Sequence, residues 1–349
     1  MRAFTLTLRA VALGTTALLG ACRPAGAPTQ SQPPAAPGAT STAAARAGVL
    51  LVANQQAASA SIVDLAAGTV THIPVGQGPH EAAISADGRV GVITVYLAPT
   101  AEKQLAVIDM RRGAVTRFVD VAGYRRLHDV AFLPGSSSRV VVTSETARRV
   151  VEVDLEAGTV TGEVDTRAAG SHMLALASDG RTLFTANLGA TTTSQLDLAT
   201  RTFVRHVEVG PRPEGIAITP DGREAWVGSN DAGTVTVVDP KSGNVLATIP
   251  NLGFPYRITM SPSGARAIIP DPPRSRVHVL DVATRRSLGE IAVAGQPTGV
   301  RIAPDDRTAF VTLGPEGAVL TVDVEGRTVL ATHRVGAAPD GVAWGPAPR

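Results

Sequence analysis

The sequence predicts an all-β protein, a seven-bladed β-propeller over residues 48–349 that its N-terminal strand closes. Three observations predict this fold: an apolar step into aspartate that recurs seven times, a repeated corner and hairpin turn, and a strand moved from the end of the repeats to their start. Repeats of about forty residues are typical of architectures in which neighbouring units bury a shared core.

The step into aspartate sets the period of the repeat. It recurs at spacings of 45, 45, 43, 42, 42 and 42 residues, at Asp64, Asp109, Asp154, Asp197, Asp239, Asp281 and Asp323. Four-stranded propeller blades have this period. Each aspartate ends an apolar strand and enters a turn, so we expect its carboxylate to accept backbone N–H groups there and to have a structural role.

Two further markers place the other strands of each blade. A corner rich in glycine and proline precedes an apolar alternation, as in VGPRPEGIAIT at 209–219 and VGAAPDGVAWG at 335–345. Asp-Gly pairs such as Asp221-Gly222 favour a tight hairpin, and segments such as TVTVVD at 234–239 alternate as strands do. No segment after the N-terminal region has the pattern of a helix.

The two ends of the repeats predict how the ring closes. The chain stops soon after an expected inner strand that ends with 340–344, so the next strand of that blade is expected to be missing from the C-terminus. A segment of the missing type stands at the N-terminus instead, because GVLLVAN at 48–54 is similar to RTLFTAN at 181–187. We therefore expect 48–54 to complete the last blade and to leave the ring without a free edge.

These markers resemble the YVTN-type β-propeller repeat family, which includes the lactonase-like seven-bladed proteins. The stretch 209–249 fits the family pattern nearly throughout, and the resemblance extends over 48–349. One blade departs from it, with Leu133-Pro134-Gly135 in place of the usual turn, and 96–104 carries a short insertion. The resemblance implies innermost strands that line a central channel, but it implies no single activity, because fold does not fix function.

The N-terminus predicts a targeting segment and a lipid anchor. Residues 1–21 combine early arginines with a short apolar run, which is typical of a secretory signal peptide and too short to span a membrane. Leu19-Gly20-Ala21-Cys22 resembles a bacterial lipoprotein box, which implies lipidation of Cys22. The stretch 22–47 is rich in Pro, Ala, Ser and Thr and is expected to be a disordered tether. We expect a lipid-anchored cell-envelope protein, on the outer membrane facing the periplasm or on the cell surface.

The composition narrows the expected partners. Lys and Arg number 32 against 30 Asp and Glu, and basic pairs stand among acids, so no nucleic-acid-binding stripe is present. The single cysteine excludes an intrachain disulfide and a cysteine-built zinc site. We expect a monomer whose partners are a membrane, through the lipid, and either an envelope protein or a small-molecule ligand.

One repeat position does not keep its residue type and forms a candidate column. It lies at the start of each innermost strand and contains His80, His128, His172, Glu214, Tyr256, Thr298 and Asp340. Three of the chain's seven histidines fall in this column, in neighbouring blades. Because the innermost strands line the channel in the family that the chain resembles, we expect the column to ring one mouth of it.

Two chemistries fit the histidines of the candidate column. His80, His128 and His172 are candidate ligands for a divalent metal, with Glu214, Asp340 or water completing the shell. The three histidines and Glu214 are also candidates for acid and base catalysis on a lactone or ester.

Other polar residues extend the candidate site. Tyr256 and Asp340 are candidate ligand-binding residues, together with the histidines and Glu214. The neighbouring Glu81, Asp129 and Arg257 stand where they would orient ligands or hold anionic groups. The alternative is a solvated channel mouth without a specific ligand.

The remaining histidines and the ends of the second strands are assigned to the framework. The histidines fall in outer strands, at His72, His206, His278 and His333. The polar ends of the second strands are expected to cap loops rather than to hold a ligand, and include Asn54, Asn187, Asn230 and Asp271.

Three functions therefore remain open. The predicted anchor favours a binding or scaffold protein that acts through its central-channel face. The alternative is a lactonase-like hydrolase or lyase that uses the histidines and Glu214. A third is a carrier of a metal or redox centre, and a divalent metal is the only cofactor that the sequence suggests.

Overall fold

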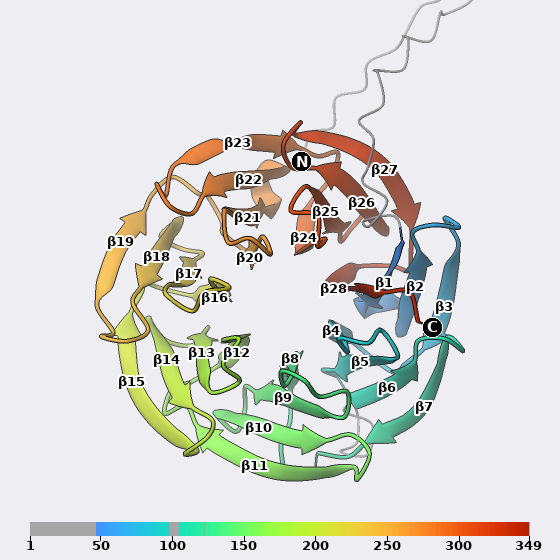
Figure 1. The fold of residues 1–349 in the computed structure, drawn as a ribbon, viewed down its shortest axis with the longest axis horizontal. Coiled ribbons are helices and arrows are strands. Elements are labelled where there is room, and N and C mark those ends of the chain that lie inside the picture. Colours follow the sequence, from blue (N-terminus) through green and yellow to red (C-terminus); the bar gives the residue numbers. More distant parts are fainter. Residues whose placement is uncertain (1–46, 98–104, 122, 349) are drawn as a thin grey trace, which may run out of the picture. The chain divides into compact units, whose positions relative to one another are not determined.

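Seven four-stranded antiparallel sheets surround a central channel as the blades of a propeller, which confirms the predicted fold (Figure 1). The computed structural model describes residues 47–97, 105–121 and 123–348. The predicted signal peptide, Cys22 and nearly all of the predicted tether lie outside these residues, as does most of the insertion at 96–104. Within the described ranges, no helix has the length and apolar character needed to cross a bilayer.

Each blade has an innermost strand that lines the channel and a second strand beside it. The innermost strands are β4 (Pro79–Ile84), β8 (Leu127–Phe132), β12 (Ser171–Leu176), β16 (Pro213–Ile218), β20 (Thr259–Met260), β24 (Pro297–Ile302) and β28 (Pro339–Pro346). The second strands are β5 (Val90–Val95), β9 (Arg139–Ser144), β13 (Thr182–Asn187), β17 (Ala225–Ser229), β21 (Arg266–Asp271), β25 (Thr308–Leu313) and β1 (Gly48–Asn54).

The third and outer strands complete the blades. The third strands are β6 (Leu105–Asp109), β10 (Arg149–Asp154), β14 (Thr192–Asp197), β18 (Thr234–Val238), β22 (Arg276–Asp281), β26 (Ala318–Asp323) and β2 (Ser59–Asp64). The outer strands are β7 (Ala114–Val119), β11 (Thr159–Asp165), β15 (Thr202–Glu208), β19 (Val245–Ile249), β23 (Ser287–Ala292), β27 (Thr328–Arg334) and β3 (Val70–Pro74).

The last blade joins the two ends of the chain, as the sequence predicted. Strand β1 pairs with the C-terminal strand β28 from Gly48 opposite Pro346 to Asn54 opposite Pro339, and it pairs with β2 on its other side. All of its residues are buried. The N-terminal strand therefore fills an interior place in a sheet and closes the ring.

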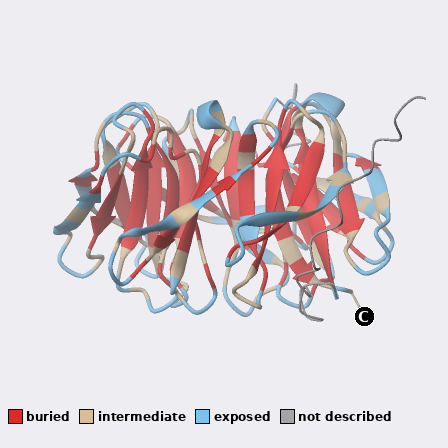
Figure 2. Cartoon of the chain, turned by 90° about the horizontal axis from the view of Figure 1, so that it is seen from above, coloured by how far each residue is buried: buried red, intermediate tan, exposed pale blue. Residues whose placement is uncertain are grey.

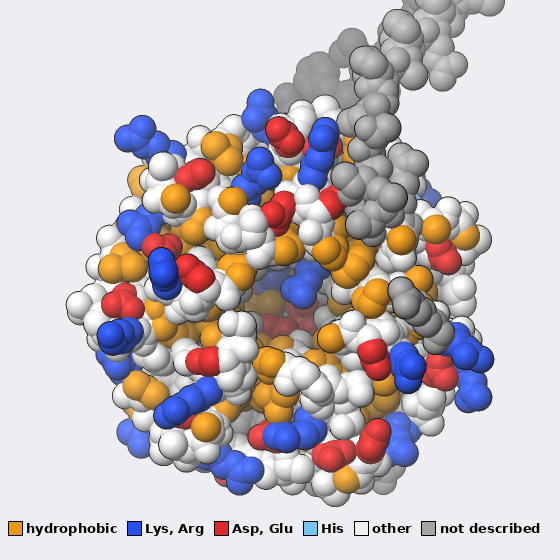
Figure 3. All heavy atoms as spheres, viewed as in Figure 1, with side chains coloured by type: hydrophobic (Ala, Val, Ile, Leu, Met, Phe, Trp, Pro, Cys, Tyr) orange, Lys and Arg blue, Asp and Glu red, His pale blue; other side chains and the backbone are white. Residues whose placement is uncertain are grey.

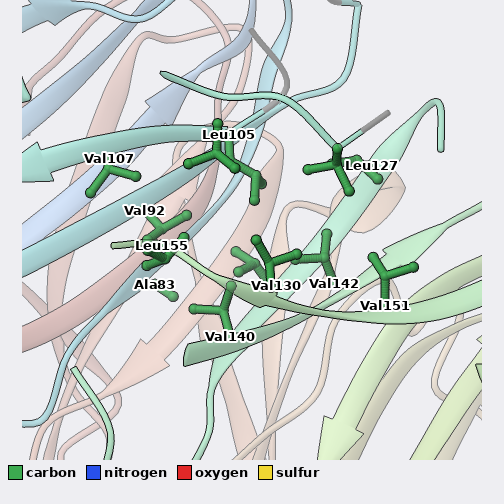
Figure 4. Close-up of a cluster of buried hydrophobic side chains, with 13 residues drawn as sticks. Ala83, Val92, Leu105, Val107, Leu127, Val130, Val140, Val142, Val151 and Leu155 are labelled. Carbon is green, nitrogen blue, oxygen red and sulfur yellow. The ribbon is translucent and has the colours of Figure 1, made fainter. Parts of the chain in front are cut away.

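The core lies between neighbouring blades, where sheet faces pack against each other. Figure 4 shows one such cluster, in which Val92 and Leu105 of one blade meet Val130 and Val142 of the next. Figure 2 shows buried residues within the strands and exposed residues in the loops at both ends. Each fully buried Val or Leu stabilises the fold by about 1.5–3 kcal/mol, so this packing holds the inner strands in place around the channel.

The repeated aspartates close the turns as predicted. Asp154 Oδ1 accepts the backbone N–H groups of Glu156 and Ala157, both at 2.9 Å, and the corresponding aspartates make similar bonds. The hairpin turns require a positive φ, which Gly222 supplies at 71° and Asp306 at 58° in a variant turn. One feature was not expected: among the described residues, single turns of 3-10 helix follow two of the second strands, at η1 (Gln55–Ala57) and η3 (Pro272–Arg274).

Candidate functional site

A β-bulge at the start of the innermost strands positions the candidate column. The pairing of β4 with β5 changes register between Pro79 and Ala82, and similar shifts occur in β8, β12, β16 and β24. A bulge re-aims the side chains beside it. His80 lies within the first of these register shifts, so its side chain is aimed differently from those in the regular part of the strand.

Threonines of the second strands tie neighbouring blades together at this level. Thr94 Oγ1 accepts the N–H of Glu81 at 2.9 Å and donates to the carbonyl of His128 in the next blade at 2.7 Å. Thr143 Oγ1 donates to the carbonyl of His172 in the same way, at 2.6 Å. The backbones that carry these histidines are thus held by the preceding blade, which sets the spacing between imidazoles.

The three histidines form a row, which we call the histidine row. The ring centroids of His80 and His128 are 4.1 Å apart, those of His128 and His172 are 3.5 Å apart, and the two end rings are 6.4 Å apart. The three residues are only 8%, 0% and 6% exposed. An open, solvated mouth was one expectation for this column. The structure instead packs the imidazoles against each other and out of solvent.

A buried arginine joins the carboxylates of three other positions around the channel. Arg257 Nη2 lies 2.7 Å from Glu81 Oε1, and Nη1 lies 2.9 Å from Glu214 Oε1. Asp340 Oδ1 is 3.8 Å from Nη2. Asn230 donates to the second oxygen of Glu214 at 2.5 Å, so this asparagine supports the site instead of capping a loop.

Carboxylates also contact both ends of the histidine row. His172 Nδ1 donates to Glu145 Oε1 at 2.5 Å, and its Nε2 lies 3.4 Å from Glu214 Oε1. At the other end, His80 Nδ1 lies 3.2 Å from Asp340 Oδ2. The structure therefore brings five members of the candidate column into one buried polar cluster.

Two side chains absent from the sequence-based candidates complete the cluster. Tyr96 donates to Glu145 Oε2 at 2.7 Å, and Arg126 Nε lies 3.1 Å from the same oxygen. Arg126 also bonds to the hydroxyl of Tyr96, and half of its side chain is exposed. The available signal was a second variable repeat position, just after the second strand, whose backbone N–H bonds to the residue before the innermost strand. In the blades with this bond it reads Gln55, Tyr96, Glu145, Leu188, Asn230 and Gly314.

Tyr256 and Thr298, the other two members of the candidate column, make different contacts. The guanidinium carbon of Arg257 lies 4.3 Å from the ring centroid of Tyr256, which supports the buried arginine. Thr298 bonds to Thr312 and to the carbonyl of Pro339, at 2.9 and 3.0 Å, and so joins two blades.

The residues assigned to the framework mostly act there. Asn54 bonds to Ser59 and Ser61, and Asn187 bonds to residues of its own blade. His72, His206 and His333 lie on outer strands as expected. His278 does not: it lies on the third strand β22 and is buried.

Burial and hydrogen bonding move the pKa values within the row in opposite directions. Burial, with His172 and His80 nearby, lowers the pKa of His128 well below its usual range. Burial also acts against the charged form of His172, but its hydrogen bonds to Glu145 and Glu214 outweigh this and raise its pKa. The row therefore combines a neutral imidazole at its centre with one that carries a proton more readily.

A cavity of about 500 Å³ lies next to the cluster, toward the hairpin turns of the blades. Glu81, Asp129 and Arg257 line its polar end, and Pro134 and Pro220 line its turn end. Figure 3 shows a hollow at the centre of the ring, with hydrophobic side chains around it and charged side chains deeper inside. Burial raises the pKa of Asp129 to about 7.

Small side chains on the innermost strands make room for this cavity, and one blade has an arginine in their place. Three residues after each member of the candidate column, five blades have alanine and two have Thr259 and Arg301. Arg301 is open to the cavity, yet protein surrounds it, and this enclosure lowers its pKa although Asp129 acts in the opposite sense. Within the described ranges, the Arg301 side chain has neither a hydrogen bond nor an ion pair.

Comparisons with known proteins agree with the architecture. No protein-family model matches the chain, and no curated protein matches it. Among solved structures, 1766 chains match, so the fold is widely shared and does not select a function. One of them, hydrazine synthase of Kuenenia stuttgartiensis, aligns with a TM-score of 0.70 and 18% identity over 79% of this chain and 92% of that chain. At this identity the likeness shows a β-propeller fold.

Proposed function

We propose that this protein is a lipid-anchored cell-envelope binding protein whose central cavity holds a small organic anion with an apolar part. The observation that carries the proposal is Arg301, whose guanidinium has no hydrogen bond or ion pair to the described residues and lies in a cavity lined mostly by apolar residue types. A guanidinium in such surroundings binds carboxylate or phosphate oxygens strongly, often through two parallel hydrogen bonds.

The rest of the cavity suits the apolar part of such a ligand. Its wall includes Phe132, Met173, Leu176, Ile218 and Ile302. Its volume of about 500 Å³ is in the usual range for small-molecule sites. The location of the protein in the envelope rests on the lipoprotein box at Cys22.

The burial of the histidine row favours binding over hydrolysis. A lactone or ester would have to reach imidazoles that are at most 8% exposed. Catalysis by the histidines and Glu214 therefore requires an opening of the cluster, whereas the cavity beside Arg301 is already formed.

Octanoate and octan-1-ol, which share a chain length and differ in charge, test the proposal by calorimetry and thermal unfolding. We expect octanoate to bind more tightly and to raise Tm more. Arg301→Met should weaken octanoate binding roughly ten- to hundredfold, which corresponds to a charge-assisted hydrogen bond.

The matched control is Arg223→Met, which removes an exposed arginine that forms an ion pair with Asp221. It should leave octanoate binding unchanged. Equal binding of octanoate and octanol, or unchanged octanoate binding in Arg301→Met, would show that the proposal is wrong.

A further inference from the structure

We propose that His128, His172 and Glu145 bind a transition-metal ion of the Zn²⁺ or Cu²⁺ class, at a site separate from the cavity of Arg301. One potential ligand atom from each of the three residues lies within 4.8 Å of the others. Imidazole nitrogens with a carboxylate oxygen are a donor set that these ions prefer. Ligand bonds of about 2.0–2.2 Å to one ion would require the three side chains to adjust from this arrangement.

The hydrogen bonding of His128 points independently to a missing ligand. The residue is 0% exposed, and neither of its ring nitrogens has a hydrogen-bond partner among the described residues. Folded proteins rarely leave a buried polar group unpaired. A metal ion beside His128 would occupy one of these nitrogens.

The neighbours of the other two ligands have the arrangement expected around a metal. Glu214 Oε1 lies 3.4 Å from Nε2 of His172, where it orients the ring while Nδ1 faces Glu145. The second oxygen of Glu145 is held by Tyr96 and Arg126. Carboxylates that orient a ligating imidazole raise its basicity and affinity for the metal.

The charges of the cluster also leave room for a divalent cation. Two guanidiniums contact the carboxylates, which leaves two negative charges in excess when the histidines are neutral. The carboxylates are Glu81, Glu145, Glu214 and Asp340, and the guanidiniums belong to Arg126 and Arg257. One divalent ion would balance this excess.

A second group, made of His80, Glu81 and His128, is geometrically similar but less suitable. Glu81 Oε1 already binds the buried Arg257 at 2.7 Å, so a metal there would lie beside a fixed positive charge. Glu145 instead contacts Arg126, whose side chain is about half exposed, so solvent partly screens this positive charge.

Zinc binding to the full chain tests the assignment. The protein is produced without a histidine tag, stripped with a chelator, and titrated with Zn²⁺ by calorimetry, with metal content measured by mass spectrometry. We expect about one Zn²⁺ per chain. His172→Ala and Glu145→Gln should each lower the affinity at least tenfold, whereas the matched variant His80→Ala should retain it.

A spectroscopic measurement identifies the ligands directly. In the Cu²⁺-loaded protein, electron paramagnetic resonance should show coupling to two imidazole nitrogens, and to one in His172→Ala. Glu145→Gln nearly conserves shape, so it keeps the test decisive if His172→Ala does not fold, which circular dichroism would reveal.

Three results would overturn the proposal: no Zn²⁺ retained by the parent, unchanged affinity in both His172→Ala and Glu145→Gln, or a loss in His80→Ala as large as in His172→Ala. The last result would assign the ion to the other group or to all three histidines. None of these results depends on octanoate binding, so this proposal and the proposed function fail independently.

Discussion

At the scale of single residues, the position of His128 lowers the free energy of unfolding when no metal ion is bound. Its backbone carbonyl is bound by Thr94, and its ring is packed between two other imidazoles, with neither nitrogen paired to any residue that the structure describes. A buried polar group without a partner costs about 1–3 kcal/mol. His172, by contrast, contacts a carboxylate at each nitrogen.

Replacing these two histidines by leucine should therefore have opposite effects. In metal-free protein, His128→Leu should leave the free energy of unfolding unchanged or raise it by about 1 kcal/mol, because an unpaired group is removed. His172→Leu should lower it by about 2 kcal/mol, because it leaves Glu145 and Glu214 with one partner fewer. Urea unfolding after chelation measures both. A larger loss in His128→Leu than in His172→Leu would contradict this account.

The histidine row could be predicted from the sequence because its residues share one repeat position. Glu145 and Arg301 occupy other positions, and each is recognisable only by comparison with the same position in the other blades. The burial of the row could not be predicted, because it depends on how side chains from separate blades pack across the channel. The contact of Arg257 with Glu81, 176 positions away, is of this kind.

At the scale of strands and turns, the repeated aspartates make the blades sensitive to acid. A side-chain hydrogen bond from Arg181 is the main cause that lowers the pKa of Asp197 to about 2. Hydrogen bonds from Thr284 lower the pKa of Asp281, and those from Arg307 lower that of Asp323, against the effect of burial. These carboxylates keep their charge in the folded state at a pH where an unfolded chain would bind protons.

The sign of the effect follows from these shifts. A carboxyl group whose pKa is lowered on folding stabilises the fold above its unfolded value of about 3.9, and this contribution is lost as the pH falls through the folded value. We expect the contribution of these aspartates to Tm to be lost as the pH falls from about 4 to about 2. In Asp197→Asn the fall in Tm should be shallower, as measured by thermal unfolding across this range. An equally steep fall in the variant would exclude Asp197 as a contributor.

The regular strands could be predicted because each blade repeats the same alternation and the same turn residues. The single 3-10 turns at η1 and η3 could not, because each occupies only three residues and follows local backbone geometry after a second strand. They lie outside the repeat pattern from which the blades were inferred.

At the scale of the whole molecule, the ring depends on the seam between β1 and β28. Leu51 lies opposite Ala343 on one side and Ile62 on the other, so its strand is bonded along both edges. The outer strand β3, in contrast, is bonded along one edge only. Opening the seam would leave two long unpaired edges in the same molecule.

A proline at the seam should therefore be far more damaging than one at the rim. Because β1 has a partner strand on each side, the backbone N–H of Leu51 faces a partner on either side. Leu51→Pro removes this N–H, at a cost of about 3 kcal/mol or more. Thr71→Pro, in the outer strand β3, should cost less. Thermal unfolding and gel filtration should show a lower Tm and aggregation for Leu51→Pro alone. Equal destabilisation by the two prolines would contradict a special role of the seam.

The closure of the ring has a consequence for how the protein is made. The chain is synthesised from its N-terminus, so β1 is made before the strands of the other six blades. Its partner β28 is made only after them. During this interval the seven residues GVLLVAN present an apolar strand with one edge unpaired, which favours association with other chains. The final blade therefore assembles only after the other six blades have been synthesised, and β1 is exposed to association with other chains until then.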